Sequence, residues 1–427
     1  MTIAVARGLS PLRTVLEGGA VVTVQEASMT PAVTINATVQ AGGVYEPEGQ
    51  NGIAFLTGRV LDRGTESRSA DVIAEALDER GVALRIATAR HTTTVSGTCL
   101  AEDFDDVLAI VLDTVRRPVF PEAEVAKRRA ETINGLRQDQ DNPAVRATEV
   151  LFGLLYGENH PYARRAKGTI ESVSAITRDE LAAYHRARYR PTLLSLVIVG
   201  DVKAGRALER AALELEGWTG AAPADPSLPS PPAHADRRDV VVAIEGKSQC
   251  DIAYGFTSIR RLDPRYYAYW LMNNVLGQFG LGGRLADNIR ERQGMAYYAY
   301  SALDPSVGEG PLVIRAGVDP GNVARAVAAI DHEVGTMGTG GVTADELAQS
   351  KQYLIGSIPR MLETNAGIAS FLQTIEQFEL GLDYDRRLPE RLRAVTIEEV
   401  CAAAVEQLHP ERASVAIAGP TAPSSAV

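Results

Sequence analysis

The sequence predicts an α+β protein built from two homologous halves, each with an antiparallel sheet covered by helices on one face. Three observations lead to this prediction. Strands and helices follow one another in the same order before and after a proline-rich segment at residues 218–238. Two local features then recur at the same spacing of 219 residues. Repeated features in a single register are the pattern of a duplicated unit.

These repeated features lie at the end of each half. Thr177 and Glu180 form a predicted helix-capping box, and Thr396 and Glu399 repeat it. Each of these predicted helices is followed by a proline turn and an apolar strand, at residues 190–200 and 409–419. One shared box would be a coincidence, whereas two features at one spacing indicate duplication.

The other elements follow from local patterns. In the first half we expect strands at 20–25 and 33–41, helices at 52–63 and 69–80, strands at 82–87 and 92–99, a helix at 104–114, and a long polar helix after Pro121. The alternation of Val33, Ile35, Ala37 and Val39 predicts a half-buried strand.

The second half repeats this order. We expect strands at 239–244 and 251–256, helices at 264–278 and 283–293, strands at 295–303 and 312–316, a helix at 320–337, and a long helix after Thr343. Each half is expected to contain two related subdomains, which gives four in the chain.

The predicted domain boundaries follow the repeat. We expect an N-terminal domain at 1–217, a linker at 218–238, a C-terminal domain at 239–420 and a flexible tail at 421–427. The linker contains five prolines among alanines and serines, so we expect an extended segment without packed structure.

Composition excludes several classes of partner. The 427 residues carry a net charge of −11 without a basic stripe, so no nucleic-acid partner is expected. The three cysteines are isolated, which fits a reducing compartment, and the cytoplasm is the predicted location. No apolar run reaches the roughly 18 residues of a membrane span, and no signal peptide is recognisable.

Residues 52–65 carry the most informative motif, Gly-Ile-Ala-Phe-Leu-Thr-Gly-Arg-Val-Leu-Asp-Arg-Gly-Thr. It has the frame of an inverted zinc-peptidase motif, His-x-x-Glu-His, which places two histidine ligands and the catalytic glutamate on one helix. The corresponding places hold Phe55, Gly58 and Arg59. Phenylalanine cannot bind zinc, glycine has no side chain to act as a base, and a guanidinium repels a dication.

Further segments match a known family in order and spacing. They are Gly157-Glu-Asn-His-Pro-Tyr, Tyr189-Arg-Pro-Thr, Gly200-Asp and Arg290-Glu-Arg-Gln-Gly-Met-Ala-Tyr. Over residues 10–420 the chain resembles the pitrilysin/insulinase-type zinc peptidases, and within them the two-half, dimer-forming subfamily of mitochondrial processing peptidase. The resemblance implies the metallopeptidase fold shared by LuxS and the processing peptidases.

The resemblance also locates a third ligand position. In active members a glutamate on the long helix completes the zinc site, and counting back from Asp141-Asn-Pro places it at Gly135. All three ligand positions (Phe55, Arg59, Gly135) and the base position (Gly58) are therefore expected to be degenerate. The six scattered histidines show no zinc-binding spacing, so no metal is expected in this chain.

Arg290 and Tyr297 are the candidate functional residues of the second half. The resemblance implies that such a pair, seven residues apart, leans into a zinc site and stabilises the oxyanion of the scissile carbonyl. A guanidinium and a phenol are suitable donors for that charge. The structural alternative is that Arg290 neutralises a helix C-terminus and Tyr297 packs at a strand edge.

A glycine-rich stretch at residues 277–284 precedes this pair. It follows a helix and lacks Gly-Lys-Ser/Thr, so it is a weak match to a phosphate loop. The resemblance implies that Gly280, Gly282 and Gly283 provide mobile backbone along a peptide channel. A plain turn between two helices is the alternative.

Together these features predict a non-catalytic subunit of a heterodimeric zinc metallopeptidase, inactive alone. A homologous partner with His-x-x-Glu-His would supply the zinc, and this chain would present Arg290 and Tyr297 to a peptide substrate. The alternatives are a structural scaffold like the core proteins of a respiratory complex, a peptide-binding homodimer without cleavage, or an accessory subunit in the maturation of a modified peptide.

Overall fold

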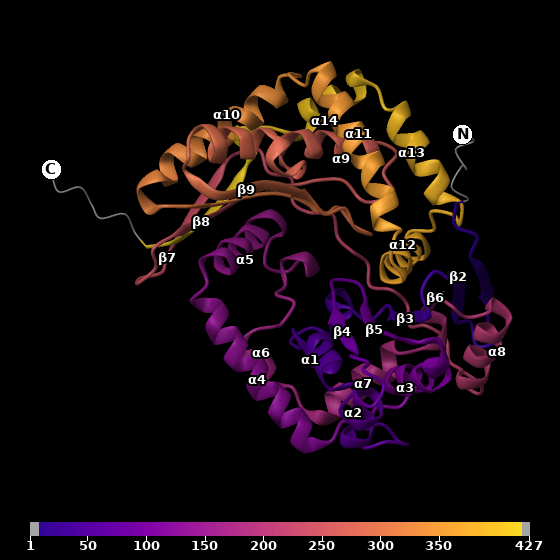
Figure 1. The fold of residues 1–427 in the computed structure, drawn as a ribbon. Coiled ribbons are helices and arrows are strands. Elements are labelled where there is room, and N and C mark those ends of the chain that lie inside the picture. The colour runs from indigo at the N-terminus through magenta and orange to yellow at the C-terminus, as the bar shows by residue number, and fades with distance from the viewer. Residues whose placement is uncertain (1–7, 421–427) are drawn as a thin grey trace, which may run out of the picture. The chain divides into compact units, whose positions relative to one another are not determined.

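The computed structural model describes residues 8–420, so the predicted tail at 421–427 lies outside the described residues. Within the described range, no helix is both long and apolar enough to cross a membrane. Contacts divide the chain into two compact units, each with one sheet (Figure 1). The first contains residues up to 136, 165–227 and 358–387, and the second contains 137–164, 228–357 and those from 388.

The first unit holds a six-stranded sheet in the order β1-β2-β6-β3-β5-β4. Its strands are β1 (Leu12–Val15), β2 (Val21–Glu26), β3 (Ala32–Val39), β4 (Arg85–Thr88), β5 (Thr93–Leu100) and β6 (Leu194–Gly200). The helices of the chain's first half are α1 (Ile53–Val60), α2 (Ala70–Asp78), α3 (Phe104–Arg116), α4 (Glu122–Gln140), α5 (Pro143–Tyr156), α6 (Ile170–Ala175), α7 (Arg178–Arg188) and α8 (Ala204–Glu214). The buried face of α3 packs into the same core as the odd-numbered residues of β3.

The second unit holds a five-stranded sheet in the order β7-β11-β8-β10-β9. Its strands are β7 (Arg238–Ala243), β8 (Cys250–Thr257), β9 (Ala296–Leu303), β10 (Pro311–Val318) and β11 (Ser414–Gly419). The helices of the chain's second half are α9 (Tyr266–Asn273), α10 (Val323–Gly338), α11 (Ala344–Met361), α12 (Asn365–Gln377), α13 (Tyr384–Ala394) and α14 (Ile397–Gln407).

These elements confirm the predicted class of two related α+β halves. Both predicted capping boxes form, at Thr177–Glu180 and Thr396–Glu399. The sheets are mostly antiparallel, but each also contains one parallel pair, β2 with β6 and β7 with β11. These parallel pairs occupy equivalent places because β6 and β11 are the strands that end the two repeats.

Each half of the sequence contributes one helix that packs on the sheet of the other half. α5, from the first half of the sequence, packs on β8 and β11, and α12, from the second half, packs on β3 and β6. Figure 1 shows α5 on the face of the second sheet opposite α9 and α10. Each exchanged helix begins at a side-chain cap, Asn142 or Thr364, directly after a long helix. Each sheet is therefore covered on its second face by a helix from the other repeat.

This exchange corrects the prediction of a half-buried strand at residues 33–41. β3 is buried on both faces, including the polar side chains of Thr34, Asn36 and Thr38. The physical reason is α12, which covers the face that alternation alone would leave to water; Asn365 at its start donates to the Ala32 carbonyl at 2.9 Å. Thr34 and Thr38 satisfy their hydroxyls with Thr98 and Thr94 on β5.

The proline-rich segment has no helix or strand before β7, as expected for a linker. The expectation that it is unpacked is wrong at three points. In the first unit Arg188 pairs with Asp225 at 3.5 Å. In the second, His160 Nε2 bonds the Pro229 carbonyl at 2.9 Å and His234 Nε2 bonds the Leu155 carbonyl at 3.2 Å. The segment is therefore fixed to both units.

Candidate functional site

Helix α1 carries the degenerate zinc motif and is held firmly at its start. Gly52, the residue before it, has a left-handed φ of 95°, and a Cβ there would approach the Lys167 carbonyl oxygen at 2.7 Å. The buried Glu46 carboxylate accepts from the backbone nitrogens of Gly52 and Ala54 at 3.0 and 3.1 Å. A carboxylate at this end is favourable because the first N–H groups of a helix are unpaired and the helix dipole is positive there. No local pattern in the sequence pointed to Glu46, which lies six residues before the glycine that it binds.

The three motif positions on α1 have different surroundings. Phe55 is half-buried, Gly58 is buried and Arg59 is exposed. A Cβ at position 58 would lie 2.6 Å from the Thr88 hydroxyl oxygen on β4, so that hydroxyl occupies the space of a side chain. No general base can be supplied from this position as the helix stands.

Arg59 is neutralised by the long helix α4. Its Nη2 atom lies 2.8 Å from Glu131 Oε2, and Arg128 lies 2.7 Å from the same carboxylate oxygen. The hydrogen bond from Arg128, followed by the charges of both arginines, lowers the pKa of Glu131. This carboxylate is therefore ionised at neutral pH and paired with guanidinium groups rather than with a metal.

Gly135 lies one turn after Glu131 on α4, and a Cβ there would meet nothing within 4 Å. The third ligand position thus has open space but no donor atom. Across residues 8–420 no group of three or more His, Cys, Asp or Glu side chains could hold a metal ion. The residues of the first unit do not fit zinc, and no step of a reaction can be assigned to a metal here.

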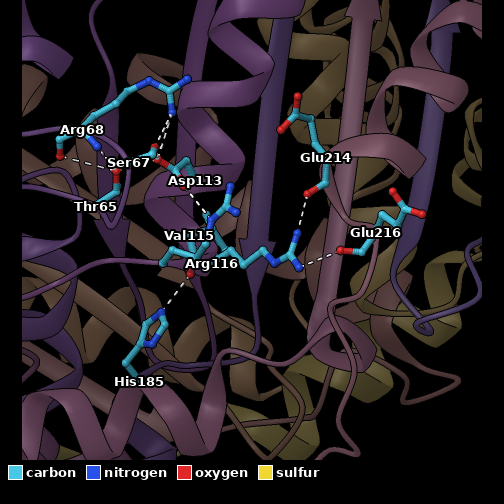
Figure 2. A network of polar contacts seen from close by, with 10 residues as sticks. Thr65, Ser67, Arg68, Asp113, Val115, Arg116, His185, Glu214 and Glu216 are labelled. Carbon is cyan, nitrogen blue, oxygen red and sulfur yellow. Dashed lines mark hydrogen bonds and ion pairs between the residues drawn. The ribbon is translucent and has the colours of Figure 1, made fainter.

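The loop after α1 is fixed by a buried carboxylate that sequence reasoning missed. Figure 2 shows Asp113 of α3 accepting from the hydroxyls of Thr65 and Ser67 at 2.5 and 2.6 Å and from Arg68 at 2.9 Å. Arg117 donates to its second oxygen at 2.8 Å. Burial raises the pKa of Asp113, but the hydrogen bonds from Ser67 and Thr65 and the pairing with Arg117 outweigh burial and lower it. The sequence feature that could have pointed to this network is Asp113 itself, an acidic residue within the mostly apolar run 104–115.

His185 lies close to the same network (Figure 2). Its Nε2 donates to the Val115 carbonyl at 2.9 Å, and its ring stacks on Tyr189 at 4.4 Å. Burial lowers the pKa of His185 to about 4, so the imidazole is neutral at physiological pH. This histidine is therefore a structural donor and not a metal ligand.

Arg290 and Tyr297 lie in the second unit. Arg290 is in a short π-helical segment, η7 (Ala286–Arg292), and Tyr297 is in β9, the edge strand of the sheet. Gly294 makes the turn between them with a φ of 59°. The Tyr297 side chain is 83% exposed, and the Arg290 guanidinium forms an ion pair with its neighbour Glu291 at 3.4 Å.

The residues next to this pair are already engaged. Arg292 forms an ion pair with Asp287 at 2.6 Å, and the Tyr298 hydroxyl donates to Asp251. Of the two tyrosines, Tyr298 is therefore bonded within the chain while Tyr297 is exposed. Both arginines hold an ion pair, and that of Arg290 is the longer one, at 3.4 Å against 2.6 Å for Arg292.

The glycine-rich stretch is a compact turn between two π-helical segments, η5 (Asn274–Gln278) and η7. Gly280 has a left-handed φ of 61°, and Gly280 and Gly282 are exposed, whereas Gly283 is buried. The turn is anchored by the Phe279 ring, which meets Tyr353 of α11 edge-on at 4.6 Å. π-Helical segments are rare and are often found at functional sites. The proposed peptide contact of these glycines stays a prediction.

Comparisons with known proteins agree with this arrangement. A sequence model described as "Insulinase (Peptidase family M16)" matches residues 21–160, and one described as "Peptidase M16 inactive domain" matches residues 175–354. The chain therefore belongs to the M16, or insulinase, family of peptidases.

Individual relatives span nearly the whole chain. An uncharacterized zinc protease of Mycobacterium leprae is 28% identical over 98% of this chain and 93% of its own length. A non-peptidase homologue of Helicobacter pylori is 26% identical over 88% of this chain and 86% of its own. The crystal structure of a peptidase M16 inactive domain from Pseudomonas fluorescens superposes with a TM-score of 0.89 at 26% identity, over 97% of this chain and 98% of that one.

Proposed function

We propose that this chain is the non-catalytic subunit of a heterodimeric zinc metallopeptidase and supplies Arg290 and Tyr297 to the zinc site of its partner. The observation that carries the proposal is the contrast between the two parts of the site. The zinc-motif positions have no ligand atoms, and Arg59 is paired internally, whereas the Tyr297 phenol is 83% exposed.

The partner is a homologous chain with an intact His-x-x-Glu-His motif, which brings the zinc and the general base. When bound there, zinc would activate the attacking water. The chemical task left to this chain is to bind the peptide and stabilise the oxyanion that develops on the scissile carbonyl. The Arg290 guanidinium and the Tyr297 hydroxyl are both hydrogen-bond donors of the kind that this charge requires.

The substrate class is a peptide or a short unfolded segment. The location that we propose for the complex is the cytoplasm, which the three free cysteines fit. A second candidate function is peptide binding without cleavage. It is favoured by the relative named a non-peptidase homologue. The two candidates differ in the partner, since binding alone needs no zinc-carrying chain.

The test is to purify the tagged chain from its native host and identify stoichiometric partners by mass spectrometry, with zinc content and cleavage of an internally quenched peptide mixture measured on the complex. We expect a partner of similar size bearing His-x-x-Glu-His, with zinc and peptidase activity in the complex. Recovery of the chain alone or as a zinc-free, inactive homodimer would contradict the proposal and favour binding without cleavage.

Arg290→Ala in this complex tests the shared site. We expect assembly to be unchanged and kcat/KM to fall by about 10²–10³-fold, which is the usual loss for an oxyanion donor. Arg292→Ala is the matched control, because Arg292 is two residues away and its ion pair with Asp287, at 2.6 Å, is shorter than that of Arg290 with Glu291, at 3.4 Å. Equal activity of the two variants would refute the role of Arg290.

A further inference from the structure

Tyr297 owes its exposure to an irregularity in β9. In the pairing of β10 with β9, Gly317 lies opposite Tyr298 and Val318 lies opposite Ala296. Tyr297 is therefore an extra residue with no partner on β10, which makes it a β-bulge. Bulges bend the strand that carries them and redirect a side chain, and they often occur at sheet edges.

The residue after the bulge is tied to a second strand. Gly317 is paired with Tyr298 of β9 on one side and with Asp251 of β8 on the other. The Tyr298 hydroxyl donates to Asp251 Oδ1, so the phenol side chain crosses over β10. A Cβ at position 317 would lie 2.6 Å from the Tyr298 ring and 2.1 Å from Gln249 Nε2, so only glycine leaves room for this crossing.

The bond matters because the Asp251 side chain is removed from water. Asp251 is only 7% exposed, and burial raises its pKa while the hydrogen bond from Tyr298 lowers it. Among the described residues, Tyr298 is the hydrogen-bond donor to this carboxylate. A slip of β9 by one residue would withdraw the phenol and leave a buried carboxyl group without its donor, which is a costly arrangement. The bond therefore fixes the register of β9 at the bulge.

We propose that Asp251, Tyr298 and Gly317 form a positioning device that holds β9 in the register in which Tyr297 projects outward toward a substrate. This inference rests on the proposed function, since it assigns these residues through their effect on Tyr297. None of the three is expected to contact the substrate carbonyl, so they are positioning residues and not catalytic ones.

The test uses the complex of this chain with its native zinc-carrying partner and an internally quenched peptide mixture. Tyr297→Phe sets the reference, and we expect it to lower kcat by about 10²-fold. Tyr298→Phe keeps the ring but removes the donor, and we expect kcat to fall by about 10-fold or more with KM nearly unchanged, because small misplacement of a catalytic group is costly. Tyr300→Phe, on the same strand and 39% exposed, is the matched control and should retain full activity.

Two further variants separate positioning from stability. We expect Asp251→Ala to lower kcat, because it removes the acceptor of the Tyr298 hydroxyl. Asp251→Asn keeps an oxygen acceptor for the phenol, so we expect it to retain most of the activity that Asp251→Ala loses. The double variant Asp251→Ala/Tyr298→Phe leaves no unpaired buried carboxyl group, so it should fold even if Tyr298→Phe does not, and its kcat should stay low. Hydrogen exchange of the amides of 296–300 should rise in the Tyr298 variants and not in Tyr300→Phe.

The outcomes distinguish the two levels of inference. If Tyr297→Phe lowers kcat but Tyr298→Phe and the double variant do not, the positioning role is overturned and the proposed function stands. If Tyr297→Phe and Arg290→Ala both leave kcat unchanged in an active, zinc-containing complex, the proposed function itself is overturned.

Discussion

In the first compact unit, the region around the zinc motif is held by the chain itself: Glu46 binds the start of α1, Glu131 pairs with Arg59, and Asp113 binds the loop that follows. In the second unit, Tyr297 projects from a sheet edge with its phenol 83% exposed. Helix α1, which carries the predicted zinc-motif positions, is therefore held as a structural element by side-chain contacts. The second unit instead leaves the Tyr297 side chain exposed at the edge of its sheet.

The largest effect on stability is expected at Asp113, in the first unit. Asp113→Ala removes the acceptor of two hydroxyls and of Arg68 and Arg117, so we expect the free energy of unfolding in urea to fall by about 2–4 kcal/mol. Asp106→Ala on the same helix is the control, because its ion pair with Arg80 is exposed and should contribute at most about 1 kcal/mol. Equal losses for both variants would contradict the structural role of the network.

The stability of the first unit should also depend on pH through the buried His185. Its folded pKa of about 4 lies below the unfolded value near 6.5, so the unfolded state binds the proton first as pH falls. Stability should be unaffected above about pH 6.5 and should decrease between about pH 6.5 and 4, by about 2–3 kcal/mol from this group. His185→Gln, which retains a donor for the Val115 carbonyl, should show a correspondingly smaller loss over this window in urea unfolding. Parallel pH profiles for the two proteins would refute the assignment.

A smaller effect is expected at the base position. In Gly58→Ala, crowding against the Thr88 hydroxyl opposes the gain of about 1 kcal/mol from removing a helical glycine, and we expect a net loss of about 1 kcal/mol. In a Thr88→Ala background the same change should become stabilising by about 0.5–1 kcal/mol. A destabilising effect of equal size in both backgrounds would show that Thr88 is not the obstacle.

The smallest effect is expected at Arg59. Its side chain is 44% exposed and its pairing with Glu131 is at the surface, so Arg59→Ala should leave the melting temperature and the recovery of the partner unchanged. A loss of partner binding in this variant would mean that the degenerate motif contributes to assembly, and the contrast between the two units would no longer hold.

Local features of the chain were predictable from the sequence. The two capping boxes and the strand predicted at 295–303 depend on residues a few positions apart, and the structure has them in these places. The second face of β3 was not predictable, because Thr34 and Thr38 are buried by α12, which lies more than 300 residues later. For the same reason Glu46 and Asp113 had no obvious partners in the sequence. The bulge at Tyr297 depends on how β9 pairs with β10, and alternation within one strand carries no information on that pairing.

The exchange of α5 and α12 has a consequence for how the chain is made. The sheet of the first unit stays bare on one face until residues 365–377 have been synthesised, and the sheet of the second unit is completed only by β11 at 414–419. Such distant contacts impose a large loop-closure entropy and slow folding. Neither half can reach its native state during synthesis while the other is missing, so cutting the gene at the proline-rich segment should yield two fragments that aggregate when expressed separately and fold only when they are produced together.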